Sequence, residues 1–236
     1  MSGYSHRSRN NLRFHNEPTW QGRDVYTQRG PLIVNYLEQI DRVIKDATTL
    51  DHRRSFVIRF DLRFPIGWEN PDSAVISYFF DSLKAQLEAC EERKRREGKR
   101  VHPCHLRYVW AKEQSSSQNW HYHVAIFLNR DAYFTLGRIS SLHDYYDGWD
   151  AVFEPASDER NMVDRLDIAW SRALDMSYHS SKGLVHIPKN PLYKLNVKSQ
   201  DYQRQWDELF YRLSYLAKLD TKRFGDRSKN FGSSRG

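Results

Sequence analysis

The sequence predicts an α+β fold in which a split β-α-β antiparallel sheet of the RRM/ferredoxin-like type carries its helices on one face. Two observations support this prediction. Segments in which apolar and polar residues alternate indicate strands, and segments with apolar residues every three to four positions indicate helices. The strand-like segments are 55–65, 105–113, 120–128 and 184–197, and the helix-like segments are 31–50, 71–98, 160–175 and 201–222.

The first helix, 31–50, precedes the catalytic core, which we expect to occupy 55–222. The core opens with the strand at 55–65, whose Phe, Ile and Leu residues alternate and form the face expected to be buried. Arg59 and Arg63 lie on its opposite face.

The next helix begins near Asn70-Pro71, since proline fits the first helical turn, and ends near Gly98. The polar loop after 105–113 joins it to 120–128 in a hairpin with a longer connection. A sheet that is antiparallel at its centre follows from this order of elements.

The composition excludes several classes of protein. The chain has 236 residues, 39% of them hydrophobic, which is enough for a sizeable core. No apolar run approaches the roughly 18 residues that cross a bilayer, and the N-terminal residues lack the apolar stretch of a secretory signal. Cys90 and Cys104 are too few for a disulfide framework. We therefore expect a cytoplasmic protein with no membrane partner.

Basic residues concentrate at three places. The net charge is +7, and the excess lies at 1–30, 91–100 and 218–236. We expect 1–30 to be a disordered basic arm, 31–223 a single domain and 224–236 a basic flexible tail. Positive charge together with 14 Tyr, 12 Phe and 7 Trp favours nucleic acid as the partner, because cations bind phosphates and rings stack on bases. Alternatively, the basic runs are solvated tails and helix faces.

Two histidines share one face of the strand at 120–128. His121 and His123 are two residues apart, so both imidazoles point the same way. If the hairpin pairs residue 113 with residue 121, Glu113 lies on the same face, about 5 Å away. This donor set suits Mn²⁺ or Mg²⁺ acting on a phosphate, with Zn²⁺ also permitted. Alternatively, the pair is a chance spacing among 10 histidines. His186 has no comparable neighbours and is assigned a structural or surface role.

The helix at 201–222 carries tyrosines away from its apolar side. At 100° per residue, Tyr211, Tyr215, Lys218 and Lys222 form one stripe. Tyrosine is a competent covalent nucleophile, and a neighbouring lysine favours the phenolate. Alternatively, the stripe is a solvated face. The tyrosines reach the histidine face only if this helix crosses or leans over it, which the sequence leaves open.

Three motifs occur in the order found in rolling-circle replication initiators of the HUH-endonuclease superfamily, which the chain resembles. FVIRFDLRFP resembles their first motif, HYH their metal motif and YRLSYLAK their two-tyrosine motif. Most of 55–236 is more closely similar to inovirus-type (filamentous phage and prophage) replication proteins and the related YagK/YfjJ C-terminal domain, through HYHVAIFLNRD, IPKNPLYKLN and FYRLSYLAKLDTK. The resemblance implies an HUH-endonuclease fold with a C-terminal tyrosine-bearing helix.

The resemblance also implies roles for individual residues. His121 and His123 would bind the metal, Tyr215 would be the nucleophile with Lys218 beside it, and Tyr211 would be a second nucleophile. Such a protein is a site-specific single-strand DNA endonuclease and strand transferase. It nicks and religates origin DNA through a 5′-phosphotyrosine intermediate. The motif does not specify the third metal ligand.

Origin DNA, single-stranded or supercoiled, is the partner that this activity implies, in the cytoplasm of a bacterial host. Arg59, Arg63 and Lys222 are expected to contact its backbone, and Trp110 or Trp120 to stack on its bases. The sequence has no P-loop, so a host helicase would unwind the DNA and a host polymerase would extend it. Two alternatives stay open: a non-catalytic sequence-specific DNA-binding prophage regulator on a related fold, and a single-tyrosine HUH transposase.

Overall fold

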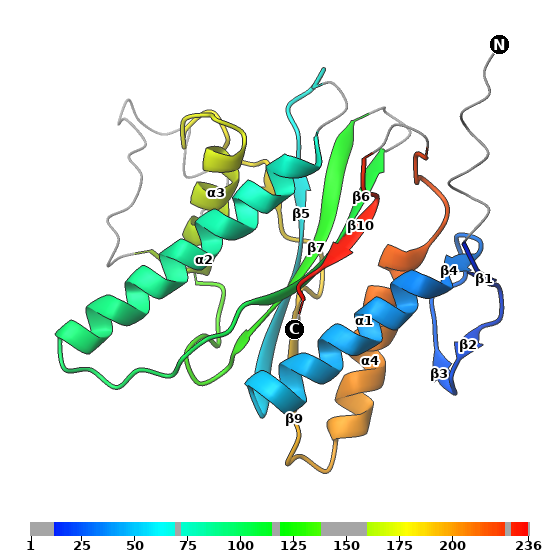
Figure 1. The fold of residues 1–236 in the computed structure, drawn as a ribbon, viewed down its shortest axis with the longest axis horizontal. Helices are drawn as coiled ribbons and strands as arrows, with labels where there is room; N and C mark the ends of the chain where they lie inside the picture. The colour runs from blue at the N-terminus through cyan, green and yellow to red at the C-terminus, as the bar shows by residue number, and fades with distance from the viewer. Residues whose placement is uncertain (1–11, 69–71, 115–118, 138–159, 225–227, 236) are drawn as a thin grey trace.

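A six-stranded antiparallel sheet forms the centre of the molecule (Figure 1). This computed structural model describes residues 12–68, 72–114, 119–137, 160–224 and 228–235. The strands run β10-β6-β7-β5-β8, and β9 also pairs with β5. They are β5 (Arg54–Arg63), β6 (Arg107–Gln114), β7 (Trp120–Asn129), β8 (Val185–His186), β9 (Leu192–Asn196) and β10 (Phe231–Ser233). The α+β class and the antiparallel sheet are confirmed.

Helices cover both faces of this sheet, so the prediction of helices on one face is wrong. In Figure 1, α2 (Ser73–Arg96) and α3 (Met162–Ala173) lie on one side, and α1 (Val34–Asp46) and α4 (Tyr202–Ser214) on the other. The second face is apolar over most of its length, because β5, β6 and β7 contribute small and large apolar residues to it. These residues, packed with α1 and α4, are Val57, Val109, Ala111, Ala125 and Phe127.

The hairpin of β6 and β7 has the register on which the predicted His/His/Glu site depends. Glu113 pairs with His121, and His123 of β7 in turn pairs with Asp61 of β5 on its other side. The polar end of the second face therefore draws on three adjacent strands. Residues 115–118, within the connecting loop, lie outside the described residues.

Residues 12–30 belong to the folded domain, which corrects the prediction of a disordered arm over that range. They form β1 (Phe14–His15), β2 (Thr19–Trp20) and β3 (Arg23–Asp24), and β1 pairs with β4 (Leu32–Ile33). Trp20 is 7% exposed and stacks on Phe210 of α4 with ring centroids 5.5 Å apart. Apolar burial against α4 thus outweighs the basic, polar composition of the segment. Residues 1–11 lie outside the described residues.

The C-terminal residues 228–235 are also ordered, so the predicted flexible tail is wrong there. Strand β10 pairs with β6, and Phe231 stacks on Tyr36 of α1 with ring centroids 4.3 Å apart. The segment has little sequence pattern of its own, but β6 offers it an unpaired edge of backbone donors and acceptors. Residues 225–227 and 236 lie outside the described part of the chain.

Helix α4 is shorter than predicted. It ends at Ser214, and a single 3₁₀ turn, Tyr215–Ala217, follows it. Lys218 then has an extended conformation with φ −58° and ψ 141°. The predicted stripe is therefore interrupted after Tyr215, and Lys218 and Lys222 do not continue the helix surface.

Helix α2 is the longest helix, with 24 residues, and the Asp72 side chain caps its N-terminus by accepting from the Ala74 backbone N–H at 3.2 Å. Gly98, just beyond its C-terminus, has a φ of +67°, a conformation that glycine adopts at little cost. Among the described residues, no helix combines the length and apolarity needed to span a membrane.

Trp170 of α3 is the largest fully buried side chain among the described residues and belongs to the core between the sheet and helices α2 and α3. It packs against Phe64, Phe79 and Tyr122, and its indole N–H donates to the Arg63 carbonyl at 2.9 Å. We expect Trp170→Ala to lower the free energy of unfolding by about 3–5 kcal/mol through the cavity that it leaves, measured by urea denaturation. Trp68→Ala, at an exposed ring, should cost less than about 1 kcal/mol. Equal losses in the two variants would contradict the assignment of Trp170 to this core.

Candidate active site

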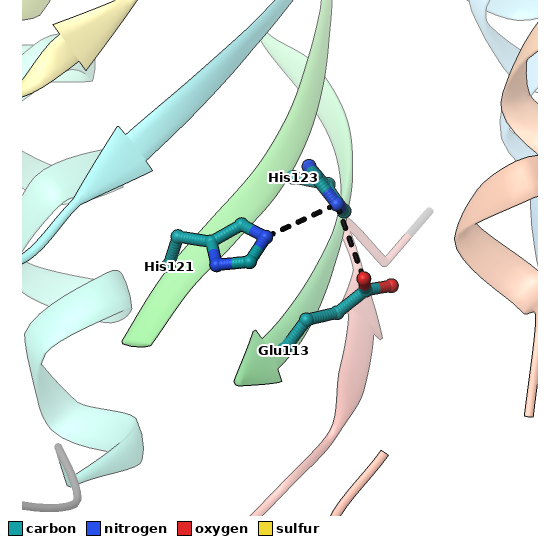
Figure 2. Close-up of side chains that lie close together, drawn as sticks. All are labelled: Glu113, His121 and His123. Carbon is teal, nitrogen blue, oxygen red and sulfur yellow. Dashed lines mark hydrogen bonds and ion pairs between the residues drawn. The ribbon is translucent and has the colours of Figure 1, made fainter. Parts of the chain in front are cut away.

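Glu113, His121 and His123 meet at the polar end of the sheet, as Figure 2 shows. One donor atom from each of the three lies within 4.8 Å of the others. The Nε2 atoms of His121 and His123 are 3.3 Å apart, and His123 Nε2 is 3.2 Å from Glu113 Oε2. The alternation of β6 and β7 produces this convergence, because all three side chains emerge on the face that carries α4.

Asp61 of β5 orients His123 from behind. Its Oδ1 lies 2.6 Å from His123 Nδ1, and Arg59 forms a buried ion pair with the same carboxylate. Arg59 Nη2 also lies 2.8 Å from His123 Nδ1, so Asp61 and Arg59 both contact this nitrogen, while Nε2 faces His121 and Glu113. A carboxylate behind a histidine is the arrangement that fixes imidazole ligands of metal ions.

The charge state of these groups follows from burial and neighbours. Burial opposes ionisation of Asp61, but its hydrogen bond with His123 and the positive charge of Arg59 outweigh burial and hold the pKa of Asp61 well below its usual range. Burial and the neighbouring His123 lower the pKa of His121 to about 4. His121 is therefore neutral at pH 7, and its imidazole is available as a ligand.

Glu113 has cationic partners that the sequence did not indicate. Its Oε1 accepts from Lys222 Nζ at 2.8 Å, and its Oε2 accepts from Lys218 Nζ and, at 2.8 Å, from Thr221 Oγ1. Glu113 and both lysines are almost completely buried. Burial opposes the charged form of Glu113, but Lys222, His123 and Lys218 outweigh it and hold its pKa below the usual range. This carboxylate thus ties β6 to the chain that follows α4.

The donor set fits a divalent ion. It combines two imidazole nitrogens with one carboxylate oxygen, and Asp61 supports one of the imidazoles from behind. A cavity of about 510 Å³ lined by Asp61, Arg63 and His121 lies beside it. Space for a substrate therefore adjoins the donor atoms.

Tyr215 lies against this cluster. It is the C-terminal cap of α4, and its ring centroid is 5.3 Å from that of His123. Lys218 Nζ lies 3.8 Å from the centroid of the Tyr215 ring. Helix α4 packs across the histidine face itself, which answers how the tyrosine reaches it. Tyr211, one turn earlier, is 38% exposed and has no ring contact with either histidine among the described residues.

Of the predicted DNA-binding residues, four are buried. Arg59 is paired with Asp61, and Lys222 with Glu113. Trp110 and Trp120 are 5% and 7% exposed and belong to the core under α2 and α3, too buried for a base to stack on their faces. The strand alternation that turns the histidines one way turns both tryptophans the other way. Arg63, which is exposed and pairs with His121 across the strands, is the member of the set that remains accessible.

Sequence reasoning missed three residues of the site. In the sequence, Asp61 is one of several polar residues that alternate with apolar residues in a strand, and nothing else distinguishes it. His186, at β8, places its Nδ1 3.1 Å from Asp61 Oδ2, and only the pairing of β8 with β5 reveals this. Tyr26 contacts Tyr211 and Tyr215 edge-on, with ring centroids 6.1 and 5.3 Å away, and comes from a segment predicted to be disordered.

The comparisons with known proteins agree on one family. The YagK/YfjJ C-terminal domain matches residues 15–234. The uncharacterized protein YagK of Escherichia coli K12 is 36% identical over 219 residues, which cover 88% of this chain and 97% of YagK. The uncharacterized protein YfjJ of the same strain is 32% identical over 212 residues, which cover 85% of this chain and 94% of YfjJ. No solved structure matches the chain. This protein is a member of the YagK/YfjJ C-terminal domain family.

Proposed function

We propose that the protein is an HUH-type rolling-circle replication initiator that nicks and religates single-stranded origin DNA through a phosphotyrosine. The observation that carries the proposal is the contact of Tyr215 with His123, at the edge of a donor set for a divalent ion. A nucleophile held beside such a set has the components needed for transesterification of a phosphodiester.

The residues of the chain divide the work as follows. His121, His123 and Glu113 would hold a divalent ion, Mn²⁺ or Mg²⁺, which when bound supplies Lewis acidity to a phosphate oxygen. The Tyr215 oxygen loses its proton and bonds to phosphorus, and the bond from phosphorus to the 3′ oxygen breaks. The products are a 5′-phosphotyrosine and a free 3′-hydroxyl. Lys218 places a positive charge against the face of the attacking tyrosine, with its Nζ 3.8 Å from the ring centroid.

Religation reverses the same step. A 3′-hydroxyl attacks the phosphotyrosine and releases Tyr215, so no ATP is consumed. In this proposal Tyr211 cuts the regenerated origin while Tyr215 still holds the first end. Arg63, at the cavity beside His121, contacts the DNA backbone. A host helicase and polymerase supply unwinding and extension.

A covalent-adduct assay tests the proposal. We expect the protein, incubated with Mn²⁺ and overlapping single-stranded oligonucleotides that tile the replicon carrying its gene, to yield a protein–DNA adduct on a denaturing gel. EDTA, His121→Ala and His123→Ala should each reduce the yield about 100-fold or more. His179→Ala, at an exposed histidine outside the site, serves as the matched control. An adduct that persists in both site variants would contradict the metal assignment.

A further inference from the structure

A second cavity lies between α2 and α3, on the sheet face opposite Tyr215. It has a volume of about 410 Å³ and is lined by five arginines: Arg93, Arg96, Arg160, Arg165 and Arg172. None of the described residues that line it is acidic. Arg93 and Arg96 also pair with Glu97 and Glu92, at 3.8 and 2.9 Å, so an anion in the cavity would share their guanidinium groups with these carboxylates.

Arg165 carries the argument furthest, because it is a buried cation without a carboxylate partner. Arg165 is 5% exposed, and its Nη1 donates a hydrogen bond to the backbone carbonyl oxygen of Gln86 at 3.2 Å. Within the described parts of the chain, no carboxylate lies within ion-pair distance of it. Burying a charge is costly unless an opposite charge compensates it. The geometry of Arg165 is thus that of an anion ligand.

An adjoining cavity of about 270 Å³ shares Arg93 and Arg165 with the first and adds aromatic surface. Tyr133 and Phe134 line it, and the Phe134 ring is 67% exposed. Lys94 Nζ lies 5.9 Å from the centroid of the Tyr133 ring. Tyr133 is partly buried against the core, so Phe134 offers the exposed ring. Cations beside an exposed ring are the combination by which proteins hold a phosphate and stack its base.

We infer that these joined cavities bind a nucleotide unit of single-stranded DNA, with its phosphate on Arg93, Arg96 and Arg165 and its base against Tyr133 and Phe134. Arginine suits this role because its planar fork donates two parallel hydrogen bonds to phosphate oxygens. The site is separate from the Tyr215 cluster and takes no part in cleavage. It would hold a DNA strand on the far side of the sheet.

Binding is measured on the full-length chain carrying Tyr211→Phe and Tyr215→Phe, so that failure of the proposed cleavage does not affect the result. The probe is a fluorescein-labelled ten-residue oligodeoxythymidine, followed by fluorescence anisotropy. We expect Arg96→Gln to weaken binding about 5- to 20-fold and to make the plot of log affinity against log salt shallower by about 1.

Arg95→Gln is the matched control. Arg95 and Arg96 are adjacent and exposed, and each pairs with a glutamate four residues earlier, at 3.0 and 2.9 Å, but only Arg96 lines the cavity. Arg95→Gln should leave the affinity within about twofold and the salt slope unchanged. Equal losses from both variants would mean that only general positive charge acts here, and would overturn the inference.

Two further measurements locate the ligand and keep the inference testable if Arg165→Met does not fold. An oligonucleotide containing 5-iodouracil should crosslink to Tyr133 or Phe134 under ultraviolet light, and Arg93→Gln should remove that crosslink. Crosslinks found only elsewhere would overturn the inference. If thymidine monophosphate displaces the oligonucleotide and binds as tightly as the oligonucleotide does, the site binds free nucleotides. That result would overturn the assignment to a DNA strand.

Discussion

The Tyr215→Phe variant is expected to form about 1000-fold less covalent DNA adduct than the unmodified chain, whereas Tyr211→Phe is expected to keep most of it. The reason is geometric. The Tyr215 ring contacts His123, with centroids 5.3 Å apart, and Tyr211 lies one helical turn farther from the donor set and is more exposed. The yield on a denaturing gel, with single-stranded DNA and Mn²⁺, measures both variants.

Tyr36→Phe is a matched control for loss of a phenol hydroxyl. Tyr36 packs on Phe231, away from the donor set, and burial raises its pKa to about 12, so it stays protonated and unreactive. This variant should cleave as the unmodified chain does. If Tyr215→Phe forms adduct normally and Tyr211→Phe does not, the order of the two nucleophiles is reversed; if their double variant still forms it, the tyrosine assignment is wrong.

Glu113→Ala is expected to lower the free energy of unfolding by about 3–5 kcal/mol, even with no metal present. The substitution removes the carboxylate and leaves the ammonium groups of Lys218 and Lys222 buried without their partner. Burial by itself lowers the pKa of Lys222, and loss of Glu113 removes the charge that opposes this shift. Urea denaturation in EDTA measures the effect.

A triple variant separates charge pairing from packing. Glu113→Leu combined with Lys218→Met and Lys222→Met replaces the buried charges by apolar side chains, and such replacements are often neutral or stabilising. We expect it to recover most of the stability that Glu113→Ala loses. If Glu113→Ala lowers the free energy of unfolding by less than about 1 kcal/mol, the two ammonium groups are hydrated in the variant and the expected penalty is absent. Because Glu113 serves the fold as well, His121 is the cleaner position for testing metal binding.

The sequence predicted which face of the central hairpin each side chain occupies, because alternation is a local property. A slip of one residue would turn every apolar residue of β7 to the wrong face, so the pattern placed Glu113 and His121 on one face. Their direct pairing was a condition that the pattern did not fix, because a slip of two residues keeps the same faces, and the structure has this pairing. That His121, His123 and Glu113 share a face was predictable from the same alternation.

The arrangement of layers was not predictable in this way. The polar residues of β5, Arg59 and Asp61, suggested a solvated face, but they pair with each other and with His123 and are buried under α4. Only knowledge of the tertiary partners separates a buried polar network from a wet surface. The same holds for Tyr26 and His186, which reach the site from segments distant in sequence.

The prediction that Lys218 and Lys222 continue the tyrosine stripe was wrong because α4 ends before them. A projection at 100° per residue assumes an unbroken helix, and the 3₁₀ turn at Tyr215–Ala217 ends it. Beyond that turn, Lys218 and Lys222 form ion pairs with Glu113. Their side-chain positions therefore cannot be calculated from an angle around the helix axis.

Strand β10 has a practical consequence for any shortened form of the protein. It covers the edge of β6 with the last described residues of the chain, and the family match extends through the same strand to residue 234. Removal of 231–236 would uncover the backbone of the strand that bears Glu113 and create an edge prone to intermolecular pairing. The smallest unit that can be transferred between proteins therefore runs from β1 through β10, and a fusion partner is better tolerated before residue 12 than in place of the C-terminus.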